Sequence, residues 1–584
     1  MSDLPKGGSF LLGQTDPQSV FTPEDFTDEH KMIYRTALGF VTDKILPNMD
    51  DLEAKKEGLS KELLMAAGEL GLLGTDVPEE YGGFAMDKIS TSIVAECMGR
   101  AGGFAMTHGG QTGIGQLPIV YFGTHEQKLK YLPEIVSGEK ATAYALTEPG
   151  AGSDALSGKA WAVLSPDGKY YILNGTKQFI TNAGFADLFI VFAKIDREKF
   201  TGFIVDADSE GLSTGPEEHK MGIKSSSTRT LILEDVKVPV ENVLFEIGKG
   251  HVIAFNILNM GRYKLAGNAV GNCKYAIELS AQFANERRQF NQHIAEFGLI
   301  KEKLAEMNTR TYIAESMVYR TGGLLDGMMH TLDLSGPDSG QVAAKGIEEY
   351  ALECSINKVF ATEVQGYVMD EGVQIHGGYG FTSEYPIERL YRDCRVYRIF
   401  EGTNEINRTV ITSTLLRRGL KGDIPVKEAI EDVRTRLAAG VPVRMNEGEL
   451  VQAAKDMLLL TLGVGIDKYG QGLLKYQEIV GKIADTAMLI FGMESGWLRA
   501  QKAVANSGEA GARIKLNMAK VFINSAVGTV FNLVKEVLAG LADGEELEGL
   551  LKDLQKLCQY TPSNTIAMRQ EIAAAVSAAS KYVV

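Results

Sequence analysis

The sequence of 584 residues has few cysteines, and none of them is arranged to hold a metal. The five cysteines, Cys97, Cys273, Cys354, Cys394 and Cys558, are scattered, with no Cys-x-x-Cys pair and no Cys/His cluster at zinc spacing. An odd number of dispersed cysteines is typical of a reducing compartment. We therefore expect no structural metal.

The sequence also lacks the excess of basic residues that a nucleic-acid partner would require. It carries 60 lysines and arginines against 75 aspartates and glutamates, a formal net charge of −15. Nucleic-acid-binding proteins usually present a basic face. The composition therefore argues against a nucleic-acid partner, while one local basic pocket could still hold a small anionic ligand.

Signals for secretion and for membrane insertion are missing from the sequence as well. The first residues, Met1 to Lys6, lack the basic region and the apolar core of a signal peptide. The best apolar run, Met457 to Ile466, is far too short to span a bilayer. We expect a soluble, cytoplasmic protein, in which the C-terminal helices pack together and could also make a peripheral membrane contact.

The periodicity of apolar residues changes twice along the chain and predicts four domains. The length exceeds one hydrophobic core, and we expect a mainly α protein with a central β module. An irregular leader of about 25 residues opens the first domain, and Asn174-Gly175 suggests a tight turn between strands of the second. The expected domains are an N-terminal helical domain (1–137), a β-sandwich or small-barrel domain (138–250), a helical bundle (251–420) and an additional helical domain (421–584).

The additional helical domain echoes the bundle before it. Lys303-Leu-Ala-Glu corresponds to Lys482-Ile-Ala-Asp, and at the same offset Glu315-Ser316 and Arg320 correspond to Glu494-Ser495 and Arg499. At a shorter offset, Lys358-Val-Phe corresponds to Lys520-Val-Phe. The pattern fits either an internal duplication or two amphipathic bundles of convergent composition. A duplication would have copied the packing and not the chemistry, which gives the last domain a structural or interaction role.

The stretch from Arg398 to Glu405 contains a carboxylate in a setting suited to base catalysis. Glu401 follows two large apolar residues and precedes Gly402. Apolar neighbours disfavour the ionised carboxylate and raise its pKa, which suits a general base near neutral pH. Thr403 is a suitable N-cap for a following helix. On these residues alone, a loop glutamate ahead of a capped helix explains the pattern more often than a catalyst does.

Other short motifs are ordinary when taken singly. Gly150-Ala-Gly-Ser-Asp-Ala155 fits a dinucleotide-binding expression, but Pro149 precedes it and β-rich sequence follows, so we reject a Rossmann turn. Exposed backbone N–H groups in such a loop could still face a cofactor or phosphate. There is no His-Glu-x-x-His sequence and no P-loop.

Taken in order, these motifs strongly resemble the acyl-CoA dehydrogenase family. The resemblance covers about residues 25–418, and the extra C-terminal domain is similar to that of the very-long-chain subgroup. The motifs that carry it are Thr147-Glu-Pro-Gly-Ala-Gly-Ser-Asp154, Ile180-Thr-Asn182, Glu286-Arg-Arg-Gln-Phe290, Gly377-Gly-Tyr-Gly-Phe381 and Phe400-Glu-Gly-Thr403.

The resemblance implies roles for residues around the acyl chain. Glu401 matches the base that removes the α-proton of the acyl thioester, and Arg262 matches an arginine near that base. The thioester oxygen would be held by a flavin hydroxyl and the Glu401 N–H. Ser153, Phe400, Gly402 and Gly110 match substrate-binding positions, with Gly110 in the floor of the acyl pocket.

The same resemblance implies an FAD site shared between subunits, and therefore an oligomer, which in the subgroup with the extra domain is usually a dimer. Thr147 and Thr181 match hydroxyls that hydrogen-bond the flavin ring, and Phe179 matches an aromatic residue packed against it. Arg287 and Phe290 match the grip on the pyrophosphate and adenosine. The residues that match the neighbouring subunit's contribution and its surroundings are Gln374, Gly377, Gly378, Thr403 and Glu405.

Two departures from the family pattern need structural answers. Asn291 stands where a glycine is common, which leaves the local turn open. Gly261 stands where some relatives carry their base, which leaves Glu401 alone in that role.

The implied function is FAD-dependent formation of a trans-2,3 double bond in a medium- or long-chain fatty acyl-CoA, the first step of β-oxidation. Electrons would pass to electron-transfer flavoprotein. The alternatives are an acyl-CoA oxidase that uses O2 and a non-enzymatic assembly or scaffold protein of the same fold.

Overall fold

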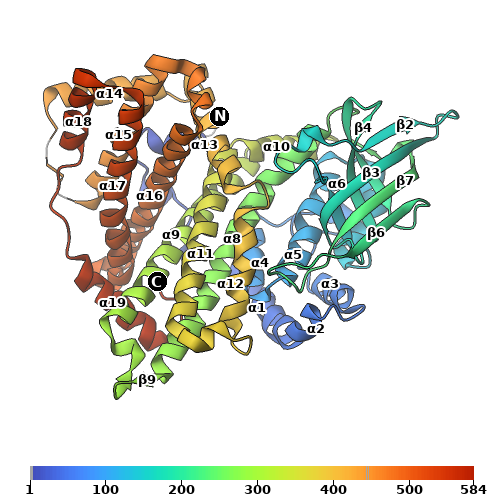
Figure 1. The fold of residues 1–584 in the computed structure, drawn as a ribbon, viewed down its shortest axis with the longest axis horizontal. Coiled ribbons are helices and arrows are strands. Elements are labelled where there is room, and N and C mark those ends of the chain that lie inside the picture. Colours follow the sequence, from blue (N-terminus) through green and yellow to red (C-terminus); the bar gives the residue numbers. More distant parts are fainter. Residues whose placement is uncertain (1–3, 442, 445) are drawn as a thin grey trace.

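A computed structural model describes residues 4–441, 443–444 and 446–584 of the chain. Figure 1 shows the β domain at one end, the long helices of the bundle in the middle and the last helical domain at the other end. The expected mainly α architecture with a central β module is confirmed.

Seven short helices form the N-terminal domain, and a π-helical turn, η8 (Gly110–Gly115), separates two of them. Local signals set the ends of these helices. At α7, Thr124 and Gln127 cap each other's backbone N–H groups, and Gly138 ends the helix in a left-handed conformation. The helices are α1 (Asp28–Phe40), α2 (Met49–Glu53), α3 (Leu59–Glu69), α4 (Lys88–Met98), α5 (Phe104–Gly109), α6 (Leu117–Phe122) and α7 (His125–Ser137).

One twisted sheet makes up the β domain. Its strand order is β6-β7-β3-β2-β4-β5-β8, and β1 pairs in parallel with β4. The strands are β1 (Thr142–Ala145), β2 (Trp161–Leu164), β3 (Tyr170–Thr181), β4 (Leu188–Ile195), β5 (Lys199–Asp206), β6 (Leu212–Glu217), β7 (Thr228–Pro239) and β8 (Val243–Leu244). The prediction of a tight turn at Asn174-Gly175 was wrong. These residues lie inside β3, where the register against β7 shifts as in a β-bulge.

The bundle follows, built on the long helices α8, α9 and α11. A short hairpin of β9 (Arg288–Gln289) and β10 (Gln292–His293) joins α8 to α9, and two 3-10 turns, η12 (Gly377–Phe381) and η13 (Arg395–Arg398), flank α12. The helices are α8 (Gly250–Glu286), α9 (Gly298–Met329), α10 (Ser339–Glu348), α11 (Ala351–His376), α12 (Pro386–Cys394) and α13 (Asn404–Lys421).

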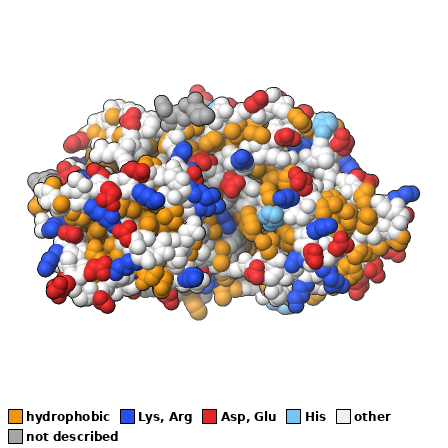
Figure 2. Space-filling view, turned by 90° about the horizontal axis from the view of Figure 1, so that it is seen from above, with side chains coloured by type: hydrophobic (Ala, Val, Ile, Leu, Met, Phe, Trp, Pro, Cys, Tyr) orange, Lys and Arg blue, Asp and Glu red, His pale blue; other side chains and the backbone are white. Residues whose placement is uncertain are grey.

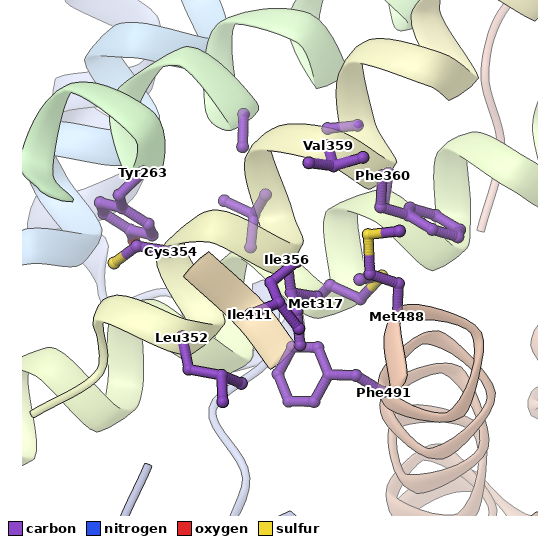
Figure 3. Close-up of a cluster of buried hydrophobic side chains, with 14 of the residues drawn as sticks. Tyr263, Met317, Leu352, Cys354, Ile356, Val359, Phe360, Ile411, Met488 and Phe491 are labelled. Atoms are coloured by element: carbon purple, nitrogen blue, oxygen red, sulfur yellow. The ribbon is translucent and has the colours of Figure 1, made fainter. Parts of the chain in front are cut away.

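The last domain packs its longest helix, α16, against the bundle. Figure 3 shows Met488 and Phe491 of α16 directed toward Met317, Ile356 and side chains of α11 and α13, all in one buried cluster. The helices of this domain are α14 (Val426–Ala439), α15 (Glu447–Tyr469), α16 (Gln477–Gly511), α17 (Arg513–Leu541), α18 (Gly544–Leu557) and α19 (Thr565–Ala579).

The contacts between these two helical domains are reciprocal. Arg320 of α9 donates to Glu494 and Ser495 of α16, at 2.8 and 3.2 Å. Arg499 of α16 donates to Glu315 and Ser316 of α9, at 2.6 and 3.3 Å. An interface in which residue i meets the copy of j, and the copy of i meets j, has two-fold symmetry. The repeat in the sequence therefore corresponds to two similar bundles that face each other within one chain.

The N-terminal segment is not the loose leader that its composition suggested. Phe10 is 5% exposed and its ring lies 4.8 Å from that of Phe491 in α16. The carbonyl of Gly13 accepts from Lys455 of α15 at 2.6 Å, and Glu24 pairs with Arg499 at 2.8 Å. Residues 10–24 therefore connect the bundle to the last domain.

One helix of the described chain, α17, has the length and apolar composition to cross a membrane. The expectation that Met457–Ile466 is the best apolar run was wrong. Of the most apolar window of α17, 44% is buried inside the protein, where α17 packs on α15 and α16. Acidic and basic side chains are interspersed over the face shown in Figure 2.

We predict that Arg499→Met destabilises the junction of the two bundles by about 1.5–3 kcal/mol, because buried Glu315 keeps Lys274 as a partner but loses the charge-assisted hydrogen bond from Arg499. Urea unfolding followed by helical circular dichroism measures the loss. The control is Arg434→Met, since Arg434 is 38% exposed and its surface pairs contribute at most about 1 kcal/mol. Equal losses in the two variants would contradict a structural role for the reciprocal pairs.

Candidate active site

Glu401 lies in the short connection between η13 and α13, and its backbone is left-handed. Its φ is +56°, and that of Gly402 is +79°. A non-glycine residue in this region is strained, so the surroundings must hold it there. The buried Asn407 amide does so, donating to the carbonyls of Gly402 and Thr403 at 2.8 and 3.1 Å. The Thr403 hydroxyl caps α13 by accepting from the Ile406 N–H, as the sequence predicted.

The carboxylate of Glu401 is kept out of water. Its Oε2 atom is buried and has no hydrogen-bond partner among the described residues. Burial raises the pKa of Glu401 to about 7, although the positive charges of Arg262 and Lys358 oppose the shift. A carboxylate with this pKa changes protonation near neutral pH, as a general base should.

Arg262 supports the backbone of Glu401 rather than its carboxylate. The arginine is 7% exposed, and its Nε donates to the Glu401 carbonyl at 3.2 Å. Its Nη1 reaches Asn259 and Ser355, each at 3.4 Å. Burial lowers the pKa of Arg262, and the charge of Glu401 counteracts that effect.

A cavity of about 100 Å³ opens beside Glu401 between α4, α8 and η8. It brings together four residues expected at the site: Glu401, Phe400, Gly110 and Thr181. The residues that complete its wall are Thr75, Thr91, Val94, Ala95, Met98, Ala105, Met106, His108, Gly109, Thr112, Gly113, Ile114, Gly261, Lys264, Leu265 and Asn268.

Sequence reasoning missed two polar residues near the base. Lys264 lies one turn after Gly261 on α8, a spacing that could have placed it on the same face. Its Nζ donates to Asp76 at 2.5 Å and to the Thr112 carbonyl at 3.0 Å. Tyr144 of β1 has a buried hydroxyl with no partner among the described residues, and burial and then the charge of Glu401 raise its pKa well above the usual value. No signal in the sequence marks Tyr144.

The residues expected around the flavin ring share one edge of the β domain. The Gln178 N–H donates to the Thr147 carbonyl at 2.9 Å, which places Thr147 beside Phe179. Phe179 is 59% exposed and left-handed, with a φ of +60°. A large apolar ring held outward in a strained backbone provides a face for a planar ligand. Ser153 lies on the exposed loop that follows β1.

The residues expected around the adenosine form a second group, far from the first. Arg287 lies at the end of α8, about 37 Å along the helix axis from Arg262 at 1.5 Å per residue. Its guanidinium lies 5.4 Å from the ring of Tyr379 in η12, the turn that contains Gly377 and Gly378. Gln374 is in the last turn of the preceding helix, α11.

The turn at Asn291 is accommodated without glycine. Phe290 and Asn291 connect β9 to β10, and both are left-handed, with φ values of +50° and +64°. This is the arrangement of a type I′ hairpin turn, in which asparagine is favoured. The turn presents the Phe290 side chain, 89% exposed, to the surface.

Among the described residues, no group of three histidines, cysteines or acids is placed to hold a metal ion. Glu405 is in the first turn of α13, where the backbone N–H groups lower the pKa of its carboxylate. It faces solvent rather than the cavity.

Comparison with known proteins decides the family. Residues 27–139, 143–236 and 248–416 match the N-terminal, middle and C-terminal domains of acyl-CoA dehydrogenases. The chain belongs to the acyl-CoA dehydrogenase family. Residues 453–556 match a further model described as an acyl-CoA dehydrogenase C-terminal domain, in agreement with the two facing bundles.

Three relatives illustrate the range of similarity. A probable acyl-CoA dehydrogenase of Bacillus subtilis is 50% identical over 100% of this chain and 99% of its own length. The very long-chain specific enzyme of Rattus norvegicus is 32% identical over 91% of this chain and 86% of its own. The crystal structure of a Bacillus anthracis acyl-CoA dehydrogenase complexed with FAD is 52% identical, covering 99% of this chain and 100% of its own, with a TM-score of 0.98.

We predict that Gly261→Ala lowers dehydrogenase activity by about 10²-fold while the fold is kept. A β-carbon at position 261 would lie 2.5 Å from Glu401 Oε2, so the flexible carboxylate must move away. Steady-state turnover of an acyl-CoA substrate measures the effect. The control is Gly39→Ala in α1, where the added methyl meets nothing within 4 Å. Wild-type turnover in Gly261→Ala would contradict the placement of the base.

Proposed function

We propose that this protein is an FAD-dependent acyl-CoA dehydrogenase that introduces a trans-2,3 double bond into medium- or long-chain fatty acyl-CoA. The observation that carries the proposal is the buried carboxylate of Glu401, with a pKa near 7, facing a cavity in a family whose substrates are acyl thioesters.

The chain's own residues supply the proton chemistry. An α-proton of a thioester is weakly acidic, so the base must be ionised and the developing negative oxygen must be stabilised. Burial raises the pKa of Glu401, and its ionised carboxylate removes that proton. Its backbone N–H donates to no described group and is held in place by the left-handed turn, so it is free to bind the thioester oxygen.

The residues present fit FAD. Thr147, Phe179 and Thr181 form the edge that would hold the ring system, and the exposed ring of Phe179 is the surface that the cofactor would cover. When bound there, FAD would supply the acceptor for the hydride that leaves the β-carbon of the substrate. We infer that Ser153, on the exposed loop that follows Thr147, contacts the part of CoA nearest the thioester.

A long acyl chain is supported by the small residues of η8. Gly110 and Gly113 project no side chain into the cavity. Met98 and Met106 also line it, and methionine side chains rearrange readily because they are unbranched and flexible. Extension of the cavity of about 100 Å³ for a longer chain would proceed by movement of these two side chains.

A homodimer is supported by the separation of the two groups of FAD residues. Arg287 lies at the end of α8 beside the turn that contains Gly377 and Gly378, whereas Thr181 lines the cavity with Gly261, about 39 Å back along the helix at 1.5 Å per residue. One compact site of the same chain would not contain both groups. Phe290 and Phe381 are 89% and 86% exposed beside this second group, so a partner subunit would cover them. Sedimentation of the FAD-loaded protein as a monomer would contradict the dimer.

The test is anaerobic bleaching of the flavin near 450 nm by butyryl-, octanoyl- and palmitoyl-CoA in wild type and in Glu401→Gln. We expect octanoyl- and palmitoyl-CoA to bleach the wild type quickly, and no acyl-CoA to bleach the variant. Glu401→Asp would be a poor control because it moves the carboxylate, whereas Glu401→Gln keeps the shape of the side chain and removes the base. Rapid bleaching of Glu401→Gln would reject the base, and a sharp preference for butyryl-CoA would reject the long chain.

The electron acceptor is tested separately. We propose electron-transfer flavoprotein, as the family resemblance implies, and expect slow reoxidation of the bleached flavin in air. Fast reoxidation by O2 would instead indicate an acyl-CoA oxidase.

A further inference from the structure

Lys358 is a buried basic residue that the proton chemistry above does not use. Burial lowers the pKa of Lys358 to about 7, and the charge of Glu401 counteracts this effect. It lies on α11, is 0% exposed, and its Nζ donates to the Gly402 carbonyl at 2.8 Å and to Asn404 Oδ1 at 2.7 Å. Both acceptors are neutral, and no carboxylate of the described chain lies within 4 Å of its ammonium. Burying an ammonium without a paired carboxylate is unfavourable, so this placement calls for a compensating function.

The two acceptors lie on opposite sides of the turn that carries the base. Gly402 follows Glu401 in the left-handed turn, and Asn404 is the first residue of α13. The ammonium therefore bridges the end of the turn to the beginning of the helix. We call this arrangement, of Lys358 with Gly402 and Asn404, the lysine clamp.

The lysine clamp is anchored on its helix side. The Asn404 amide donates to Glu363 of α11 at 3.1 Å, and Glu363 accepts from Arg408 of α13 at 2.8 Å. Arg408 in turn donates to Asp485 of α16 at 2.7 Å. These bonds tie Asn404 to two neighbouring helices, one of them in the last domain, so the free end of the lysine clamp is the turn at Gly402.

The second bundle provides a natural comparison. Lys520 occupies the matching Lys-Val-Phe sequence in α17, but its side chain is 32% exposed and Glu447 lies 3.8 Å from its ammonium. No turn like that of Glu401 exists in the second bundle's sequence. The buried, carboxylate-free lysine is thus confined to the copy that carries the base.

We propose that Lys358 is a positioning residue, whose ammonium holds the left-handed turn and thereby aims the Glu401 carboxylate and N–H at the thioester. The inference rests on the proposed role of Glu401 as the base.

The effect of losing the clamp follows from the strain in the turn. Without the ammonium, the Gly402 carbonyl keeps only the Asn407 amide, and Glu401 can relax from its positive φ. A displacement of a catalytic group by about 1 Å can slow a reaction by about 10²-fold. Lys358 does not line the cavity, so binding of the acyl chain should not change.

The experiment is stopped-flow reduction of the FAD-loaded enzyme by octanoyl-CoA under anaerobic conditions. We compare Lys358→Met, Lys358→Gln and, as the matched control, Lys520→Met. The limiting rate of flavin reduction should fall by about 10²-fold in Lys358→Met and by less in Lys358→Gln, which keeps a hydrogen-bond donor. The octanoyl-CoA dissociation constant from the same titration should change by less than about threefold, and Lys520→Met should match wild type.

Two results would overturn the inference. One is reduction of Lys358→Met at the rate of Lys520→Met, and the other is equal weakening of rate and of octanoyl-CoA affinity, which a general loss of the folded site would cause. If Lys358→Met fails to fold, the same two criteria apply to Lys358→Gln. Glu401→Gln is measured in the same way to distinguish failure of the clamp from failure of the proposed base. Flavin reduction of Glu401→Gln at the wild-type rate would reject Glu401 as the base, and not only the role of Lys358.

Discussion

Exclusion of water from the Glu401 carboxylate is the constraint on which the site depends. Burial raises its pKa to about 7, but an uncompensated buried charge would destabilise the fold. Arg262 and Lys358 provide positive charge nearby, but they donate hydrogen bonds to backbone carbonyls of the turn and not to the carboxylate. The carboxylate is thus tolerated in its ionised form without being neutralised by a direct ion pair, so it stays available to take a proton.

The additional helical domain reproduces the framework of the bundle and faces it across a two-fold relation. Arg320 and Arg499 exchange equivalent contacts across this interface, and buried side chains of α16 complete the core of α9 and α11 (Figure 3). The two bundles bury these surfaces against each other within one chain. The second bundle kept the packing residues of the first and lacks the turn that holds the base.

Much of the site followed from the sequence because its signals are local. The apolar residues before Glu401, the glycine after it and the Thr403 cap predicted a desolvated carboxylate ahead of a helix, and the structure has this arrangement. Contacts between distant segments left no such signal. The unpaired hydroxyl of Tyr144 and the burial of Phe10 against α16 depend on how the domains pack, and the bulge at Gly175 depends on its partner strand rather than on its own turn propensity.

The most direct test of the account is the pH dependence of the second-order rate constant for flavin reduction by octanoyl-CoA, which reports the pKa of the free enzyme's base. Because Glu401 must be ionised to act and its pKa is about 7, the rate constant should be level above that pH. Below it, the constant should fall by about tenfold per pH unit. A rate constant that stays level down to pH 5 would contradict the account, since it would require a base with an ordinary carboxylate pKa.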